Sequence, residues 1–142
     1  MEEITIKVKL LSEHAVLPVQ NEDGVGLDLC AAHDKRVLDG DNVIVATDVA
    51  WEIPKGHVGL VLQRSGLGAG LRLAVLGVID DTFRGGVSVN CYNVQGGGLW
   101  SIGRGDRIAQ MLILPAPRVT VVEAEELSET SRGERGFGSS GR

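Results

Sequence analysis

The sequence is poor in the residues that build disulfide frameworks and metal centres. Its 142 residues include two cysteines, Cys30 and Cys91, which stand far apart among apolar neighbours. We therefore expect two buried, reduced thiols rather than a disulfide. The three histidines, His14, His33 and His57, lie at no metal-ligand spacing from one another or from the cysteines. The sequence predicts no protein-bound metal.

Long hydrophobic runs and excess positive charge are also missing. The chain opens with Met1, Glu2 and Glu3, no run approaches the length of a membrane span, and the formal net charge is -5. A negative net charge disfavours general affinity for nucleic acid. We expect a protein that binds neither nucleic acid nor membrane and resides in the cytoplasm, or in the nucleus if its source is a eukaryote.

Aromatic residues are few, whereas glycine is abundant. Two Trp, one Tyr and two Phe stand against 20 Gly, which indicates many tight turns around a core of Val, Leu and Ile. Apolar runs typical of short strands, separated by turn residues, fall at residues 4–11, 24–32, 37–38, 43–47, 49–53, 58–63, 87–93, 99–102, 108–114 and 119–122. No long helix is evident, and the length fits one domain. We therefore expect a single all-β domain, a sandwich, barrel or jelly roll.

One stretch, residues 77–85 (GVIDDTFRG), places two carboxylates beside a bend in an apolar segment. Apolar residues on both sides continue a β-type pattern from residue 73 to residue 92, which predicts a hairpin. Asp80 would then end a buried strand, partly desolvated and rigidly held, as a general base requires. The alternative is a turn aspartate that bonds the backbone two residues on, and this stretch alone favours it.

Two polar residues interrupt other apolar runs. Asp28 must be paired or hydrogen-bonded if it is buried, either as a structural anchor or as a site residue, and Gln110 also needs a partner. A glycine-rich stretch that opens with Arg64 and Ser65 can present a guanidinium and N–H groups to phosphate, although such turns are common. The turn at residues 104–107 can hold an Arg–Asp pair.

The C-terminal residues 131–142 differ in charge from the rest of the chain. They carry three arginines against one glutamate in a sequence that is acidic overall. Glycine and serine make this segment flexible and rich in donors, so it could wrap a polyphosphate, with Phe137 offering a flat face to a base. A disordered terminus explains the same composition.

Five stretches stand in an order that resembles the trimeric dUTPase family, the deoxyuridine 5′-triphosphate nucleotidohydrolases. They are residues 26–31 (GLDLCA), 64–67 (RSGL), 77–85, 105–110 (GDRIAQ) and 132–141 (RGERGFGSSG). Each motif alone is short and prone to chance matches. Together, in family order, they span nearly the whole chain, and they turn the interpretation of Asp80 from a turn residue to a catalytic one.

The resemblance implies an architecture and a reaction. A jelly-roll-like β-domain with the nucleotide site would cover residues 1–130, and a flexible arm, residues 131–142, would close over a neighbouring subunit's site in a homotrimer with shared active sites. The implied reaction is Mg²⁺-dependent hydrolysis of dUTP to dUMP and pyrophosphate by attack of water on the α-phosphorus. It lowers dUTP and supplies dUMP for dTMP synthesis. The substrate triphosphate and waters would hold the Mg²⁺.

The resemblance also implies roles for individual residues. Asp80 would activate the water and Gln110 would help to orient the water or the α-phosphate. The residues that would bind substrate are Arg64, Ser65 and Gly66 at the phosphates, the backbone of Val78, Ile79 and Ser88 at uracil, Phe83 at the deoxyribose, Arg132 at the terminal phosphate, Phe137 at the uracil ring, and Gly138, Ser139 and Ser140 at the phosphates. Asp28, Asp106 and Arg107 would support the site.

The chain departs from the family pattern at several positions. Leu27 and Phe83 stand where the family often has an aromatic residue and a tyrosine, and Gln63 stands where proline is usual. Thr82 replaces an Asp, Gly or Asn, and Arg135 replaces a glycine or another small residue. None of these departures removes a proposed catalytic group.

Two alternative functions fit parts of the pattern. A dCTP deaminase of the same fold would need an added acid/base glutamate in the pocket, whereas the glutamates here gather at the termini and in the connector before the tail. A regulatory module would bind the nucleotide and engage a protein partner. Asp80, Gln110 and the tail favour a working enzyme, and a regulatory protein partner in addition to catalysis is compatible with the sequence.

Overall fold

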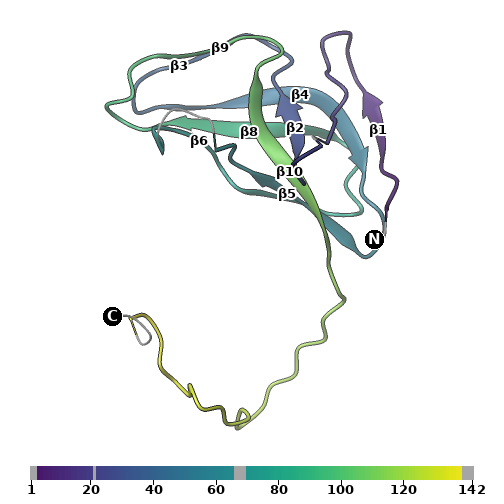
Figure 1. Ribbon diagram of the computed structural model, residues 1–142, viewed down its shortest axis with the longest axis vertical. Helices are drawn as coiled ribbons and strands as arrows, with labels where there is room; N and C mark the ends of the chain where they lie inside the picture. The colour runs from purple at the N-terminus through teal and green to yellow at the C-terminus, as the bar shows by residue number, and fades with distance from the viewer. Residues whose placement is uncertain (1–2, 21, 66–69, 139–142) are drawn as a thin grey trace.

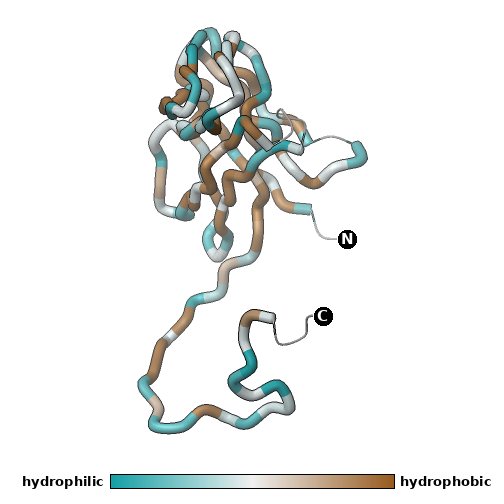
Figure 2. Tube along the Cα trace, turned by 90° about the vertical axis from the view of Figure 1, so that its left-hand side faces the viewer, coloured by the Kyte–Doolittle hydropathy of each residue, from teal (hydrophilic) through white to brown (hydrophobic). Residues whose placement is uncertain are grey.

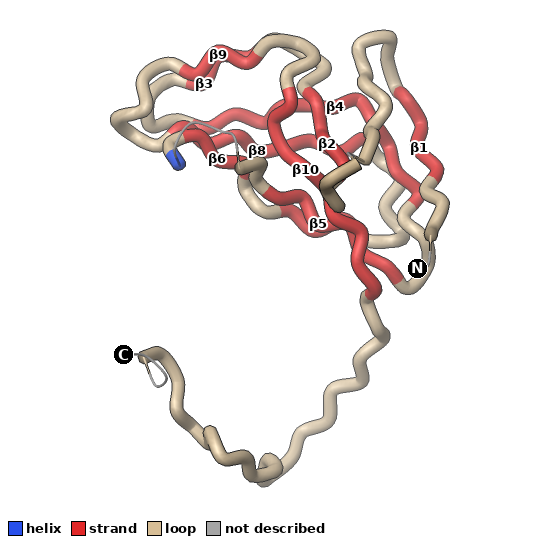
Figure 3. Tube along the Cα trace, in the orientation of Figure 1, coloured by secondary structure: helices blue, strands red, loops and turns tan. Residues whose placement is uncertain are grey.

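The computed structural model describes residues 3–20, 22–65 and 70–138, and in these ranges the chain folds into antiparallel β-sheets (Figure 1). The strands are β1 (Lys7–Leu10), β2 (Leu27–Cys30), β3 (Lys35–Val37), β4 (Asn42–Glu52), β5 (His57–Leu62), β6 (Arg72–Ala74), β7 (Gly77–Ile79), β8 (Gly86–Asn93), β9 (Trp100–Ile102) and β10 (Arg107–Pro115). Strands dominate the regular structure (Figure 3), which confirms the expected all-β class. Within the described ranges, no helix is long and apolar enough to cross a membrane.

Two four-stranded sheets enclose the core. Their strand orders are β1-β4-β8-β6 and β2-β10-β5-β7, and β3 pairs with β9 in a small third sheet. Alternate residues of the facing strands point inward, as a half-buried strand requires. The largest fully buried side chains include Val45, Val49, Val87 and Val89 from the first sheet and Leu29, Ile108 and Met111 from the second. The Val, Leu and Ile core expected from the composition is therefore present between the two sheets.

Strand β4 joins two segments that the sequence predicts as separate strands. Asp48, expected to form a turn between them, is instead an irregularity within one strand, where the register with β8 shifts between Ala46 and Ala50. Asp48 adopts φ 55°, a conformation that is uncommon for residues other than glycine. Its carboxylate accepts hydrogen bonds from the Ser12 hydroxyl at 2.8 Å and lies 3.1 Å from His33 Nε2. These contacts hold the bent conformation, so the strand continues past it.

The hairpin predicted over residues 73–92 is correct at its open end and wrong near its turn. β6 pairs with β8, with Leu73 opposite Tyr92, but β7 leaves β8 and pairs with β5 in the other sheet. Residues 80–85 therefore cross between the two sheets. Because β7 is the last strand of its sheet, its outer face is uncovered and Val78 is 61% exposed. Asp80 does not end a buried strand.

The C-terminal segment leaves the body after β10. The backbone N–H of Ala116 still donates to the Gly56 carbonyl at 2.8 Å. The chain that follows extends away from the sheets and then curves back at its end in both views (Figures 1 and 2). The strand predicted at residues 119–122 does not form, and Val121 is 88% exposed. No described strand of the same chain lies alongside this segment, so its backbone has nothing to pair with. The division of the chain at residue 130 stays a prediction.

Candidate functional site

Two arginines and an aspartate form an ion-pair group on the outer face of the β2-β10-β5-β7 sheet. Asp28 lies on β2, Arg107 begins β10, and Arg64 follows β5. Arg64 Nε donates to Asp28 Oδ1 at 3.1 Å, and Arg107 Nη1 lies 3.7 Å from Asp28 Oδ2. The side chain of Asp28 is only 17% exposed. The sequence expectation that this aspartate must be paired is confirmed, and one carboxylate orients two guanidiniums.

Gln110 lies beside this group, directly opposite Asp28 in the β2–β10 pairing. Its Nε2 donates to the Gln63 carbonyl at 3.0 Å, which supplies the partner that a half-buried amide needs. Gly26, which is buried, makes room for this side chain, since a Cβ there would overlap the Gln110 amide oxygen. We call Asp28, Arg64, Arg107 and Gln110 the arginine cluster.

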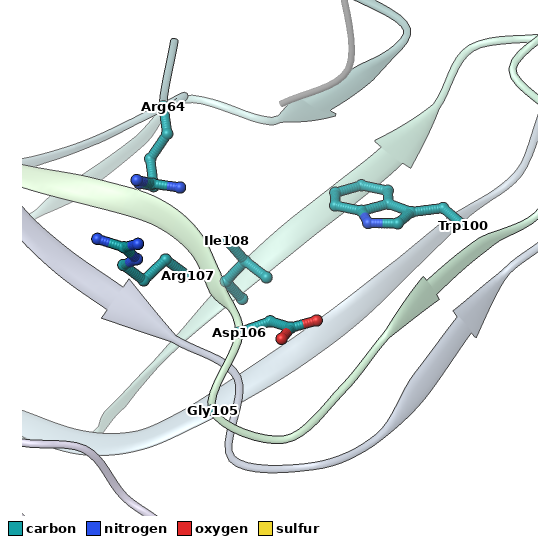
Figure 4. A pocket seen from close by; sticks show the side chains of 6 residues that line it. All are labelled: Arg64, Trp100, Gly105, Asp106, Arg107 and Ile108. Atoms are coloured by element: carbon teal, nitrogen blue, oxygen red, sulfur yellow. The ribbon is translucent and has the colours of Figure 1, made fainter. Parts of the chain in front are cut away.

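A pocket of about 400 Å³ adjoins the arginine cluster. Figure 4 shows the guanidiniums of Arg64 and Arg107 near each other at one side, with Trp100 at the other side and Asp106 below. The ring of Trp100 is fixed from another direction by Arg72, whose Cζ lies 5.7 Å from the ring centroid. The pocket presents cationic forks beside an aromatic wall, which suits an anionic ligand with oxygen acceptors.

Asp106 acts differently from the sequence expectation of an Arg–Asp pair within the turn at residues 104–107. Its Oδ2 accepts the backbone N–H of Gly103 at 2.8 Å and so closes the turn. Arg104 is held elsewhere, because its backbone N–H donates to Asp34 Oδ1 at 2.7 Å. Arg107 is thereby left to pair with Asp28 in the neighbouring strand. Asp106 therefore supports the pocket indirectly, because it fixes the backbone turn that precedes Arg107.

Asp80 lies in a turn that sits apart from the arginine cluster. The Phe83 N–H donates to the Asp80 carbonyl at 3.1 Å, and Arg84 Nη1 donates to the Asp81 carbonyl at 2.7 Å. Asp81 Oδ2 accepts the Gly56 N–H at 3.1 Å, which ties the turn to the body. Asp80 itself is exposed, and its carboxylate has no hydrogen-bond partner among the described residues. The expected partial desolvation is therefore absent in the single chain, because no described residue covers the Asp80 carboxylate.

Two strand edges connected by the Asp80 turn lack a partner among the described strands. β7 pairs with β5 on one side only. β8 pairs with β4 at Ser88, opposite Ala46, while β6 and the residue after it bond to β8 only from Asn90 onward. The backbone of Val78, Ile79 and Ser88 thus lies along edges that no described strand completes. Unpaired strand edges offer N–H and C=O groups to a ligand. The three residues predicted to contact uracil through their backbone thus lie on the two strands that the Asp80 turn connects.

Phe83 packs within its own turn. The Phe83 side chain is 44% exposed, and its ring lies across Gly85, where a Cβ would come within 2.7 Å of ring atom Cζ. Gly85 therefore allows the ring to lie flat against the turn. This gives an aromatic face at the same corner of the molecule as Asp80, as the resemblance implies for the residue against the deoxyribose.

The two catalytic candidates lie far apart in one chain. Gln110 is opposite Leu62 on β5, whereas Ile79, the neighbour of Asp80, is opposite Gly59 on the same strand. Three residues along the sheet and two strand spacings across it separate Ile79 from Gln110, a distance on the order of 15 Å. Asp80 lies beyond Ile79 in the same direction. One chain therefore does not bring Asp80 to the arginine cluster.

The remaining predicted residues are spread over loops and the arm. Ser65 is exposed in the turn after β5, and Arg132 and Gly138 lie in the exposed C-terminal segment. Phe137 is fully exposed, at 112% of its reference area. Gly66, Ser139 and Ser140 lie outside the described residues. Within the chain, the arm residues are not brought together with the sheet residues.

Sequence reasoning missed two contributors to the candidate site. Trp100 is 5% exposed and lines it from β9, yet a single tryptophan in a short apolar run gives no signal beyond burial. The sequence places Gly26 in a motif but gives it no role, because Gln110, the side chain for which it makes room, is distant in sequence. Only the pairing of β2 with β10 reveals it.

The two thiols are unlike each other. Both are free, Cys91 is fully buried and Cys30 is half-buried two residues after Asp28, so the expectation of two buried thiols holds for Cys91 only. Burial raises the pKa of the Cys91 thiol to about 11. Burial and, second, the charge of Asp28 raise the pKa of Cys30. A raised pKa keeps a thiol protonated and a poor nucleophile at neutral pH.

Comparisons with known proteins decide the family. The dUTPase family model matches residues 12–141. The chain belongs to the dUTPase family. Among curated dUTPase relatives, the deoxyuridine 5′-triphosphate nucleotidohydrolase of Hydrogenobaculum sp. is 42% identical over 139 residues, covering 94% of this chain and 96% of its own. That of Gloeothece citriformis is 39% identical over 140 residues, covering 96% of both chains.

Solved dUTPase structures share the fold. The dUTPase of Staphylococcus bacteriophage 80alpha with dUPNHPP is 31% identical, covers 97% of this chain and 99% of its own, and superposes with a TM-score of 0.90. A dUTPase mutant from phage phi11 of S. aureus, whose structure describes the coordination of a structural Mg(II) ion, is 27% identical with a TM-score of 0.80, over 87% and 98% of the two chains. The jelly-roll-like architecture is thus that of the dUTPase family.

Proposed function

We propose that this protein is a dUTP diphosphatase, which hydrolyses dUTP to dUMP and pyrophosphate. The observation that carries the proposal is the arginine cluster, in which Asp28 orients Arg64 and Arg107 beside the amide of Gln110. Guanidiniums held in a fixed orientation are suited to bind phosphate oxygens bidentately. The family relation then indicates which nucleotide the phosphates belong to.

At the phosphates, the arginine cluster neutralises charge and fixes geometry. Arg64, with the hydroxyl of Ser65, binds the phosphate oxygens, and Gln110 orients the water or the α-phosphate. The attacking oxygen bonds to the α-phosphorus, the bond from that phosphorus to the bridging oxygen breaks, and pyrophosphate leaves. Most of the catalytic effect of such a site comes from positioning and electrostatic stabilisation.

The Asp80 turn supplies the base and the sugar contact. Asp80 accepts the proton that the attacking water loses and contacts the 3′-hydroxyl of the deoxyribose. Phe83, flat against Gly85, leaves no space for a ribose 2′-hydroxyl, and the backbone of residues 78, 79 and 88, along strand edges that no described strand completes, bonds the polar edge of uracil. The exposed position of Asp80 in one chain fits a residue that works only when another surface covers it.

The donor set at the cluster suits a nucleotide that brings its own Mg²⁺. Among the described residues no group of three His, Cys, Asp or Glu could hold a metal ion, and the carboxylate of Asp28 already engages two guanidiniums. Mg²⁺ in nucleotide sites commonly keeps several waters and binds through substrate phosphates. We therefore take Mg²⁺–dUTP as the substrate.

We further propose that the active protein is a homotrimer with shared sites. Asp80 lies farther from Gln110 than Ile79 does, at a separation on the order of 15 Å or more, so a second chain must complete the site. The outer face of the same sheet is apolar between them, because Val78, Leu60 and Leu112 lie in register across β7, β5 and β10. An apolar sheet face of this kind favours burial against another copy.

The C-terminal segment also fits a place on a second copy. β2 pairs with β10 only as far as Met111, so the edge of β10 at residues 112–114 is open and borders a groove of about 910 Å³. Trp51 lines this groove, and its buried Nε1 has no hydrogen-bond partner among the described residues. The apolar residues 119–122 of another copy could add a strand there and bring a carbonyl to Trp51. The arm that follows would then reach a neighbouring site.

A pyrophosphate-release assay tests the activity. We expect hydrolysis of dUTP with Mg²⁺ and far slower release of pyrophosphate from dTTP, dCTP and UTP. The backbone that bonds uracil should reject the other bases, and Phe83 should reject the ribose of UTP. Omission of Mg²⁺ should reduce the rate strongly. Ammonia release from dCTP would point to a deaminase instead, and measurable dUTP binding without turnover would point to a regulatory nucleotide-binding protein.

Mixing two inactive variants tests the shared site. Asp80→Asn and Gln110→Ala should each be nearly inactive, but after joint unfolding and reassembly in equal amounts about one quarter of the sites should combine an intact Asp80 with an intact Gln110 from different chains. Each variant refolded alone is the control. If mixing restores no activity, both residues act within one chain and the shared-site proposal is wrong.

A further inference from the structure

The C-terminal segment has local structure at one place. Among the described residues, 117–129 make no hydrogen bond to one another or to the body, whereas residues 130–135 form a turn with five internal hydrogen bonds. In this turn Gly133 adopts φ 60° and its N–H donates to the Thr130 hydroxyl at 3.1 Å. The turn therefore has a defined shape without any contact to the rest of the protein.

Arg135 makes most of these bonds. Its backbone N–H and its Nε donate to the Arg132 carbonyl at 3.4 and 3.0 Å, and its Nη2 donates to the Ser131 carbonyl at 3.2 Å. In return, Arg132 Nε donates to the Arg135 carbonyl at 2.9 Å. The two arginines thus hold each other's backbone, and a planar fork that spans two carbonyls is a geometry that arginine provides and lysine does not.

The arrangement leaves the terminal nitrogens of Arg132 available. Its Nε bond sets the plane of the guanidinium, and its Nη1 and Nη2 have no partner within the described part of the chain. These two nitrogens are the ones that bind a phosphate side by side. Glu134, the acidic residue of the turn, makes no side-chain hydrogen bond or ion pair in the same described ranges and does not compete for them.

We propose that Arg135 is a positioning residue for closure of the arm: it holds the turn at residues 130–135 so that Arg132 enters the site already shaped to bind phosphate. The role rests on the proposed function. A segment that is ordered before it docks loses less conformational entropy on binding. At a position where the family pattern usually has a small residue, this chain therefore carries a side chain that shapes the arm.

Steady-state kinetics of three variants test the role. Arg135→Ala should raise KM for dUTP by about three- to tenfold, because a few exposed, charged hydrogen bonds are lost. The kcat should stay within about twofold, since the lost interaction acts before chemistry. Arg135→Lys keeps the charge without the fork and should recover less than half of the loss, and Glu134→Gln should change nothing. An unchanged KM in Arg135→Ala, or full rescue by lysine, overturns the proposal.

A second measurement does not depend on turnover. In the nucleotide-free protein, NMR should show slower exchange with water for the Nε–H of Arg132 than for that of Arg118, an exposed arginine with no side-chain hydrogen bond among the described residues. The difference should vanish in Arg135→Ala. Equal exchange of the two arginines in the wild type overturns the preformed turn. A wild type that releases no pyrophosphate from dUTP overturns instead the proposed function, and with it the role in closure, even where Arg132 is protected.

Discussion

The arginine cluster and the Asp80 turn, residues 80–85, are both built on one sheet, but they differ in how complete they are. In the cluster each polar group has a partner within the chain: Asp28 bonds Arg64 and pairs with Arg107, and Gln110 bonds the Gln63 carbonyl. In the turn, by contrast, the carboxylate of Asp80 is exposed and has no hydrogen-bond partner among the described residues. Folding of one chain therefore assembles the arginine cluster, but it leaves the carboxylate of Asp80 exposed at the surface.

The difference follows from the position of each group in the sheet. β2 and β10 lie side by side, so their polar residues meet across neighbouring strands, and Gly26 gives Gln110 the space to do so. β7 is a three-residue strand at the opposite edge, with no described strand beyond it to cover Asp80. A carboxylate at an open edge stays solvated until a partner surface arrives. Folding can therefore preorganise the phosphate side while assembly completes the base.

Substitution of Asp80 should have the largest effect on turnover. Asp80→Asn should lose about 10²–10⁴-fold in turnover, the usual scale for a general base, and should bind dUTP nearly as well as the wild type. Folding should be unaffected, because the side chain has no hydrogen-bond partner among the described residues. Asp81→Asn is the matched control: its carboxylate bonds Gly56 N–H, so a small loss of stability with near-normal turnover is expected. Pyrophosphate release and thermal melting check both. Near-wild-type turnover in Asp80→Asn would remove its role.

Deleting residues 131–142 should have the next largest effect. The hydrogen bonds of the described part of this arm are all local, so the truncated protein should keep its thermal stability and its oligomeric state in sedimentation. Turnover should fall by about 100-fold or more, because the arm supplies phosphate donors and excludes water. Full activity after truncation would show that the arm is a dispensable terminus.

Asp28→Asn tests the arginine cluster. Loss of the carboxylate leaves Arg64 and Arg107 without the charge that orients them, so KM for dUTP should rise by about tenfold and the free energy of unfolding should fall by about 1–3 kcal/mol. Asp23→Asn, at an exposed position outside the cluster, is the control. Unlike Asp80→Asn, this variant should show both a kinetic and a stability change. A stability change alone would make Asp28 a structural anchor only.

Gly26→Ala should give the smallest effect of the four. The added methyl group would overlap the Gln110 amide oxygen, so the amide group must turn and its Nε2 would lose the hydrogen bond that it donates to the Gln63 carbonyl. We expect turnover to fall by about three- to tenfold, a partial loss of the positioning that Gln110 provides. In the background of Gln110→Ala the same substitution should cost little further, because both act on one side chain. Additive effects in the double variant would mean that Gly26 acts through another contact.

The candidate site shows what sequence reasoning reaches and where it stops. Asp28 and Gln110 were identified because a polar residue in an apolar strand needs a partner, and the structure supplies one for each. The hairpin at Asp80 was predicted from local pattern, and it failed near the turn because β7 pairs with β5, more than a dozen residues earlier in the chain. The local pattern likewise predicts a turn at Asp48. The strand continues there instead, because Ser12 and His33, which are distant in sequence, contact the Asp48 carboxylate.

By itself, the sequence determined the strand-rich class of this protein, its family and the residue types of its site, because alternation, turn chemistry and short motifs are local properties of a chain. Only the tertiary structure decided which of those residues meet. Strand order and register bring Asp28, Arg64, Arg107 and Gln110 together and leave Asp80 on a distant, uncovered edge. Pairing between distant strands is set by the packing of the whole core, which no local pattern encodes.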